Sequence, residues 1–312
     1  MIRINKTING ILVPQDSISR DCWVNLFVPT EAEMSKVAEA TGIPWDFLAD
    51  PLDADERSRL EMEDDCLLVV IQAPLFNEAD DRIPYITIPI GVILTPEVVV
   101  TVCRSPADLV GQLLSVRNKH VATQESMRFT LHLMQRVAMN YLRDLKDLSR
   151  MTLQMEQELY KSTRNEELIR LLNAGKSLVY FITSLEANGV TMGRLLQTKL
   201  IALDEEEEDL LEDAITENRQ ALGMARIHSD ILSSVSDALA SIISNNMNNV
   251  VKFLTGFTII MMIPNIITGA YGMNTALPFS SDGNPLNFCI IMLASLAASC
   301  LTWWFFRKKR WL

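Results

Sequence analysis

The sequence predicts an α+β membrane protein: an N-terminal α/β domain, then a long stalk helix that continues into the first of two C-terminal transmembrane helices. Two long apolar stretches near the C-terminus predict the spans. Strand-length aliphatic runs within residues 1–120 predict the α/β domain. Beyond them, strand signals stop and long helical patterns rich in Leu, Met, Glu, Lys and Arg predict the helices.

Composition excludes several classes of function. The 312 residues carry 28 Lys and Arg against 39 Asp and Glu, and this net charge of −11 argues against a general nucleic-acid binder. Five cysteines without a CxxC spacing exclude a disulfide framework and a zinc ribbon, and suit a reducing compartment. The chain has no glycine-rich phosphate loop, nucleophile elbow or HExxH motif, so nothing predicts an enzyme.

The apolar stretches are residues 250–270 and 286–306, each 21 residues long. As helices they span about 31 Å, which matches the hydrocarbon core of a bilayer. A basic tail, 307–312, follows the second span, and the positive-inside rule therefore places the C-terminus in the cytoplasm. Two spans return the chain to its starting side, so the N-terminal region is also cytoplasmic and the 271–285 loop is external.

Within the α/β domain, Thr95-Pro96-Glu97 separates two strand signals as a hairpin turn does. One helix is expected over Thr30–Thr41. The predicted organisation is a cytoplasmic α/β domain (1–120), a cytoplasmic helical and stalk region (121–246) and a transmembrane domain (247–312). The predicted strands are Cys22–Val28, Cys66–Ala73, Tyr85–Leu94 and Val98–Cys103.

Two long helices are expected at Met127–Tyr160 and Asn165–Lys199, before the stalk helix. Asp204 and Glu207 have the spacing of a capping box and predict where the stalk begins. The acidic run Asp204–Asp209 fits a capped helix start better than a metal site, because adjacent carboxylates on a helix point in different directions. A seam with alternating steps of four and three residues predicts that the stalk packs against a partner helix, with self-association as the simplest source. It comprises Leu211, Ile215, Asn218, Leu222, Ala225, Ser229, Leu232, Ser236, Leu239 and Ile243.

The first span carries polar groups that a lipid-facing anchor does not need. They share one helical face with two apolar bands, Val251–Leu254 and Met262. Two readings stay open: the face packs against another helix through small and polar residues, or it lines a path for ions in an oligomer. The face comprises Asn248, Val251, Leu254, Thr258, Met262, Asn265, Gly269 and Gly272.

A conducting face of this kind restricts the mechanism. It holds no carboxylate, so it suits a cation that travels largely hydrated, such as Mg²⁺, which releases its waters reluctantly. The two apolar bands are suited to closing such a path by dewetting.

Tyr271-Gly272-Met273-Asn274 directly follows the first span, and a basic stretch ends the chain. In these features, and in the stalk and α/β domain, the chain resembles the CorA family of divalent-cation transporters, whose signature is Gly-Met-Asn at this place. The resemblance covers essentially the whole chain. It implies a funnel-shaped homopentamer in the inner membrane, with the first span lining a pore for Mg²⁺, and with Co²⁺ or Ni²⁺ as further ions.

The resemblance also implies roles for individual residues. Gly272, Met273 and Asn274 would form the outer mouth, and Asn248 a polar ring at the cytoplasmic end of the pore. Leu254 and Met262 would form the hydrophobic gate. Asp50 and Asp213 would bind regulatory Mg²⁺ between neighbouring subunits. The residue types alone also fit a turn before Pro51 for Asp50 and a solvated helix face for Asp213.

The external loop departs from the family pattern. Magnesium-selective members often follow Gly-Met-Asn with an aromatic residue and a Met-Pro-Glu-Leu segment, whereas residues 275–284 here hold one carboxylate, Asp282. Asn265 follows Pro264 where a hydroxyl residue is more usual. The pattern also drifts from that of the related ZntB branch, which resembles CorA in fold but is associated with zinc and proton coupling. A proton-coupled Zn²⁺ transporter of that type is the alternative. A non-conducting membrane-anchored scaffold or sensor is a third hypothesis.

Overall fold

The computed structural model describes residues 1–78, 82–105, 108–115, 122–161, 165–197, 203–273, 277 and 285–309. The chain divides into two units, Met1–Ser234 and Val235–Leu312. Helix α6 (Glu205–Tyr271) begins in the first unit and ends in the second. The three-part division expected from the sequence is drawn at other points and stays a prediction.

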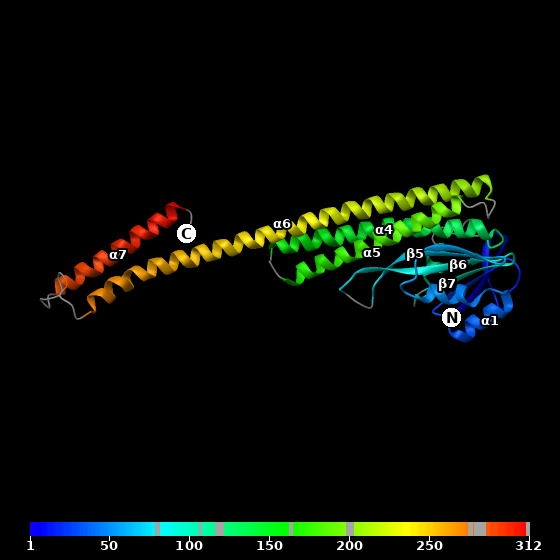
Figure 1. Ribbon diagram of the computed structural model, residues 1–312, viewed down its shortest axis with the longest axis horizontal. Helices are drawn as coiled ribbons and strands as arrows, with labels where there is room; N and C mark the ends of the chain where they lie inside the picture. Colours follow the sequence, from blue (N-terminus) through cyan, green and yellow to red (C-terminus); the bar gives the residue numbers. More distant parts are fainter. Residues whose placement is uncertain are drawn as a thin grey trace. The chain divides into compact units, whose positions relative to one another are not determined.

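The first unit is built on a seven-stranded mixed sheet with strand order β2-β1-β3-β7-β6-β5-β4. Figure 1 labels β5, β6 and β7 of this sheet. Only the β3–β7 pair is parallel among the described strands, with Cys22 opposite Val98. The strands are β1 (Ile2–Ile8), β2 (Ile11–Gln15), β3 (Cys22–Phe27), β4 (Arg59–Glu63), β5 (Cys66–Phe76), β6 (Tyr85–Leu94) and β7 (Val98–Cys103).

The four predicted strands are confirmed, β6 and β7 at their predicted limits. The Thr95-Pro96-Glu97 turn is also confirmed, because the Thr95 amide donates to the Val98 carbonyl at 3.1 Å. Sequence patterns missed β1, β2 and β4, which lie toward the two edges of the sheet and are half exposed. Polar residues on their exposed positions interrupt the aliphatic runs that mark the buried strands.

One face of the sheet is covered by α1 (Glu31–Thr41), α2 (Trp45–Ala49) and the 3₁₀ helix η1 (Asp50–Leu52). A capping box between Thr30 and Glu33 starts α1. Helix η1 lies so close to β6 that a Cβ atom on Gly91 would collide with the ring of Pro51. Gly91 thus permits the backbone approach that fixes η1, and with it Asp50, on the sheet.

The other face carries α3 (Leu109–Ser115), α4 (Ser126–Lys161) and α5 (Asn165–Gln197), which confirm the two long helices expected before the stalk. Aromatic side chains fill this interface: Trp23 lies 5.3 Å from Phe129 between ring centroids, and Tyr141 lies 5.1 Å from Phe181. Buried rings in tilted and edge-to-face pairs hold the helices on the sheet.

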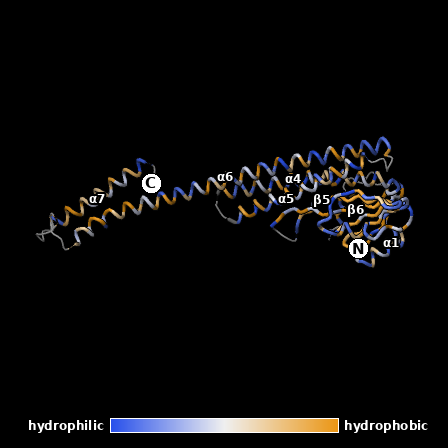
Figure 2. The backbone as a smooth tube through the Cα atoms, in the orientation of Figure 1, coloured by the Kyte–Doolittle hydropathy of each residue, from blue (hydrophilic) through white to orange (hydrophobic). Residues whose placement is uncertain are grey.

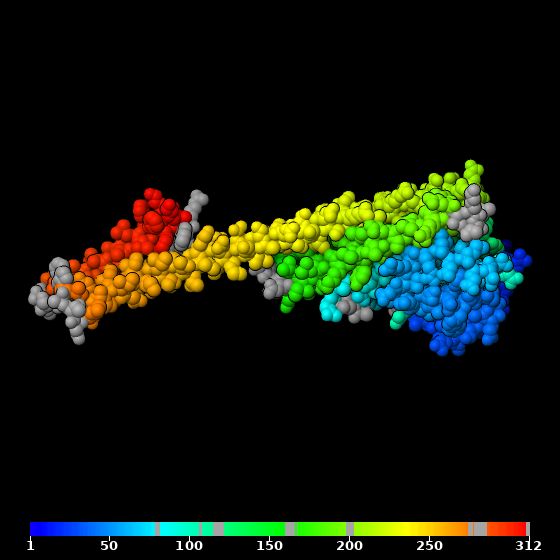
Figure 3. All heavy atoms as spheres, viewed as in Figure 1, coloured from blue at the N-terminus to red at the C-terminus, as the bar shows by residue number. Residues whose placement is uncertain are grey.

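The first part of α6 packs along α5, and Figure 3 shows their atoms side by side. The predicted capping box is confirmed: Glu207 N donates to Asp204 Oδ1 at 2.8 Å and Asp204 N to Glu207 Oε2 at 3.1 Å. Asn218 of the predicted seam donates to the Leu185 carbonyl at 2.8 Å. The partner helix of this part of the seam is therefore α5 of the same chain.

The second unit holds the remainder of α6 and helix α7 (Pro285–Lys308). Both helices are long and apolar enough to cross a membrane, and Figure 2 shows hydrophobic residues along both. Pro264 lies inside α6 and removes one backbone donor. One turn after it, Thr268 Oγ1 donates to the Pro264 carbonyl at 2.9 Å.

Candidate ion pathway and regulatory carboxylates

The predicted polar face lies on the second part of α6. Every member of the face is exposed in the single chain, including the large apolar side chains of Leu254 (62%) and Met262 (54%). Gly272 follows directly after the helix. Exposed positions along one side of a membrane-spanning helix contact lipid, water or another chain.

The covered positions of the same helix lie on its opposite side. Gly256 is buried, and Ile260, Ile263 and Ile267 are half exposed. At 100° per residue, these positions are centred roughly 160° around the helix from the predicted face. Helix α7 has its own covered line of positions, with Ser295 buried at 3% exposure. The predicted face is thus separate from the side of α6 that the rest of the second unit covers.

The polar groups of the face present oxygen atoms outward. Thr258 Oγ1 donates to the Leu254 carbonyl at 2.8 Å, which satisfies its proton and leaves its lone pairs as acceptors. The amides of Asn248 and Asn265 are exposed above and below it along the helix. Neutral oxygens of this type can hold the water shell of a cation without stripping it.

The C-terminal end of α6 forms the start of the predicted mouth. Gly272 N donates to the Thr268 carbonyl at 2.9 Å and Met273 N to the Ala270 carbonyl at 3.3 Å. A Cβ atom on Gly272 would lie 3.3 Å from the Thr268 carbonyl oxygen, so glycine suits this tight helix end. Met273 is 63% exposed. Asn274, most of the external loop and the end of the basic tail lie outside the described residues.

Asp50 lies at the start of η1, where its carboxylate binds Arg59 Nη2 at 2.6 Å. Arg59 also binds Glu61 at 2.9 Å and contacts Glu56. Burial alone would lower the pKa of Arg59, but the hydrogen bonds that it donates to these carboxylates raise it above its ordinary value. Sequence reasoning missed this arginine, because Arg59 begins β4, a strand that it did not predict, and the intervening residues 53–58 bring it back to η1.

Asp213 is exposed on α6, one turn before Glu217. Burial raises the pKa of Glu217, a hydrogen bond from Gln135 lowers it, and the Asp213 charge raises it. The i,i+4 spacing was visible in the sequence, yet nothing there indicated that Glu217 is partly buried against α4. Among the described residues of one chain, no group of three or more His, Cys, Asp or Glu side chains is placed to hold a metal ion.

Comparison with known proteins decides the family. A model described as "CorA-like Mg2+ transporter protein" matches residues 20–308. The chain belongs to this CorA-like family. The cobalt/magnesium transport protein CorA of Methanocaldococcus jannaschii is 27% identical over 295 residues, covering 93% of this chain and 91% of that protein.

Solved structures agree with this family assignment. The complete structure of the CorA magnesium transporter from M. jannaschii matches with a TM-score of 0.85 and 26% identity, over 100% of this chain and 99% of that one. The ZntB cytoplasmic domain from Vibrio parahaemolyticus matches with a TM-score of 0.59 over 78% of this chain and 98% of that one. At 9% identity, the ZntB match shows a shared fold alone.

Proposed function

We propose that this CorA-family chain is a homopentameric channel of the inner membrane that takes up Mg²⁺, and Co²⁺ with it. The observation that carries the proposal is the exposed polar face of α6, which lies opposite the covered side of that helix. The family model of a CorA-like Mg²⁺ transporter matches residues 20–308 of the same chain. Ni²⁺ is a further ion of the same charge and coordination preference.

An oligomer is needed because one helix with one polar face cannot enclose a path. Closed rotational symmetry brings the same face of every subunit to a shared axis. Polar side chains exposed to hydrocarbon are costly, and placing Asn248, Thr258 and Asn265 at a water-filled axis removes that cost. Five subunits follow from the family resemblance.

Along this axis the ion travels with most of its water. Gly272, Met273 and Asn274 form the outer mouth, Asn248 forms a polar ring at the cytoplasmic end, and Gly269 leaves room near the mouth. The bands at Val251–Leu254 and Met262 close the path by dewetting when the helices approach. The N- and C-termini are cytoplasmic in this arrangement, as the basic residues after the second span favour.

Regulation by intracellular Mg²⁺ completes the proposal. A divalent ion between Asp213 of one subunit and the Asp50 region of the next favours the closed assembly, and its loss lets like-charged faces separate. The ion-pair between Asp50 and Arg59 weakens the contribution of Asp50 to such a site, so we assign the larger share to Asp213.

Ion flux into proteoliposomes tests transport. We expect Mg²⁺ entry that follows membrane voltage and ignores a proton gradient, and loss of entry in Asn274→Ala with assembly intact. Unchanged flux in Asn274→Ala would refute the mouth assignment. One alternative is a ZntB-like transporter, because a ZntB cytoplasmic domain shares the fold of this chain. Zn²⁺ entry that rises with an inward proton gradient would establish that alternative.

Substitution of two matched threonines distinguishes an ion-conducting protein from a non-conducting scaffold. Thr258 and Thr302 each donate to the backbone carbonyl four residues earlier, at 2.8 and 2.9 Å, but Thr302 lies on α7. We expect Thr258→Val to reduce Mg²⁺ flux about tenfold and Thr302→Val to leave it near wild type. Background flux in the wild type and in both variants would favour the non-conducting scaffold or sensor.

A further inference from the structure

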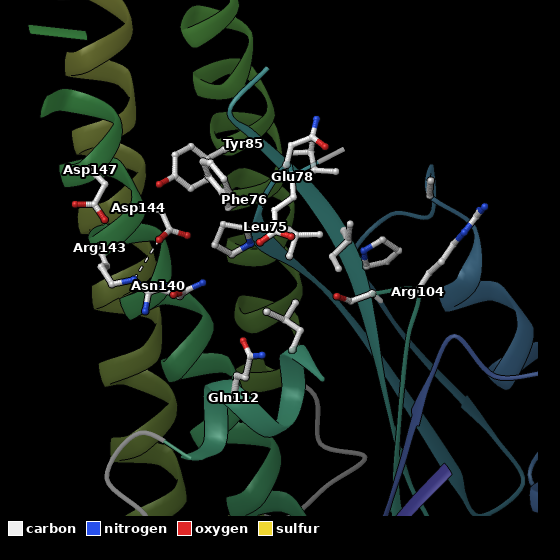
Figure 4. Close-up of a pocket in the computed structure, with 18 residues that line it drawn as sticks. Leu75, Phe76, Glu78, Tyr85, Arg104, Gln112, Asn140, Arg143, Asp144 and Asp147 are labelled. Carbon is white, nitrogen blue, oxygen red and sulfur yellow. Dashed lines mark hydrogen bonds and ion pairs between the residues drawn. The ribbon is translucent and has the colours of Figure 1, made fainter. Parts of the chain in front are cut away.

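A cavity of about 880 Å³ opens in the first unit between the β5–β6 hairpin, α3 and α4 (Figure 4). Its lining is largely apolar, with aliphatic and aromatic side chains from the hairpin and α3. The cavity is large enough for a small organic molecule. The apolar residues used in the argument are Leu75, Phe76, Tyr85, Ile88 and Leu109.

Helix α4 contributes a line of polar side chains to this cavity. Asn140, Asp144 and Asp147 follow steps of four and three residues, and Figure 4 shows them along one side of the helix. Asp144 is the unusual member, because it is only 5% exposed. Its Oδ1 accepts from Arg143 Nε at 3.2 Å, and that arginine side chain is itself 67% exposed. Water screens Arg143, so the buried carboxylate is incompletely compensated.

Two further observations indicate that the cavity is built for an occupant. Ser105 lines it, is fully buried, and its Oγ has no hydrogen-bond partner among the described residues. A buried hydroxyl without a partner is costly, and a bound molecule would supply one. Tyr85 also lines the cavity; burial, and after it the charges of Asp144 and Asp147, raise its pKa to about 12 against a smaller lowering by Arg143. The negative field of the α4 carboxylates therefore reaches across to the hairpin.

We propose that this cavity binds an organic ammonium ligand, a protonated amine on an apolar body. The ammonium group lies against Asp144 and Asp147, and the body lies on Leu75, Ile88 and Leu109. Arg104 and Arg143 also line the cavity, and Asp147 pairs with Arg150 at 3.2 Å, so the buried charge of Asp144 is the group that selects a cation. The apolar walls select an organic one, because they cannot replace the hydration shell of Mg²⁺. The phenol ring of Tyr85 adds a cation–π surface for the same group.

Equilibrium dialysis of the full-length protein in nanodiscs tests this site, with empty nanodiscs as reference. The probes are phenethylammonium, its anionic counterpart 3-phenylpropionate, and Mg²⁺ alone as competitor. We expect phenethylammonium to bind, at least tenfold more tightly than phenylpropionate, and 10 mM Mg²⁺ to leave the binding within about twofold. Stronger binding of the anion would overturn the proposal, as would full displacement by Mg²⁺.

Two variants and one control locate the binding. Asp144→Asn keeps the shape of the side chain and removes the charge, and we expect it to weaken phenethylammonium binding at least tenfold. Leu75→Trp fills the apolar side and should abolish binding with every charge retained. Asp230→Asn alters an exposed carboxylate on α6 and should change nothing. Equal affinity in wild type and both cavity variants would refute the site, whatever ion the protein transports.

Discussion

At the scale of single residues, Asn188 takes the place of a missing strand. Strand β4 pairs with β5 only as far as Val70, so the backbone of Gln72 has no strand on that side. The fully buried Asn188 amide accepts from Gln72 N and donates to the Gln72 carbonyl, both at 2.8 Å, and also accepts from Ser58 Oγ. One side chain thus joins α5 to the sheet.

We expect Asn188→Ala to lower the free energy of unfolding by roughly 1–3 kcal/mol, because it leaves the buried Gln72 N–H without that acceptor, while the Gln72 carbonyl keeps Tyr141 Oη at 3.1 Å. Denaturant unfolding of the purified full-length protein, followed by circular dichroism, measures this. Arg194→Ala, an exposed change on the same helix, should stay within about 0.5 kcal/mol. Similar values for the two variants would show that water or a neighbour replaces the amide.

Asp144 gives a pH dependence with a definite sign. Burial raises its pKa from 3.8 to about 6, Arg143 lowers it, and Asp147 raises it. Tyr85 faces the same carboxylate from β6. Because the folded-state pKa is the higher one, the folded state holds the proton more tightly, and stability falls as pH rises from about 4 to about 6.

Above pH 6 the ionised Asp144 destabilises the folded state to its full extent. The difference between the folded and unfolded pKa values of Asp144 corresponds to roughly 3 kcal/mol at most. Asp144→Asn should therefore stabilise the protein at pH 7.5 by up to that amount and have little effect near pH 3.5. Thermal unfolding at both pH values measures the difference. Destabilisation at pH 7.5 would mean that the Arg143 ion pair outweighs burial.

At the scale of elements, two glycines of α5 differ in what surrounds them. A Cβ atom on Gly189 would lie 3.2 Å from Asn218 Nδ2, which is already held by the Leu185 carbonyl. Gly193, one turn later, has nothing within 4 Å of such an atom. The first glycine permits close approach of α6, and the second only weakens the helix.

Alanine at these two positions should therefore have opposite effects. Gly193→Ala should stabilise by up to about 1 kcal/mol through helix propensity. Gly189→Ala gains the same propensity but displaces Asn218, and we expect a net loss of about 1 kcal/mol or more. Thermal unfolding of both variants measures the two changes in stability. Stabilisation by both would show that α6 shifts without cost.

The sequence predicted the elements whose pattern is set by burial on one side or both. The buried strands β6 and β7 and the helices α4 to α7 follow from aliphatic runs and long periodic patterns. Edge strands such as β4, with the sequence RLEME, carry too few apolar residues to be recognised. For these strands pairing with a neighbour outweighs local propensity, and pairing is not visible in one strand alone.

The same division holds for the candidate sites. The polar face of α6 was predictable because its residues share one helix and a regular spacing. The Asp50–Arg59 ion pair and the cavity beside Asp144 were not, because each joins residues from separate elements. Asp144 also occupies a buried position of an amphipathic helix, where sequence reasoning expects an apolar residue.

At the scale of the whole molecule, α6 contributes to both units. Its first part carries Asp213 and packs on α5, and its last part carries the polar face. In the proposed oligomer, a continuous helix is a physical means by which an ion bound near Asp213 can influence the packing of that face among subunits. Coupling of this kind requires that the ion bind the closed and open assemblies with different affinity.

Neutralising Asp213 should therefore weaken inhibition by Mg²⁺ on the side of the N-terminal unit. We expect Asp213→Asn to raise the half-inhibiting Mg²⁺ concentration at least fivefold in proteoliposome flux, within the usual range of coupling energies. Asp50→Asn should have a smaller effect, because Arg59 already neutralises that carboxylate. Asp230→Asn, exposed further along α6, is the matched control. Unchanged inhibition in Asp213→Asn would remove this residue from regulation, while the flux of the wild type would still test transport separately.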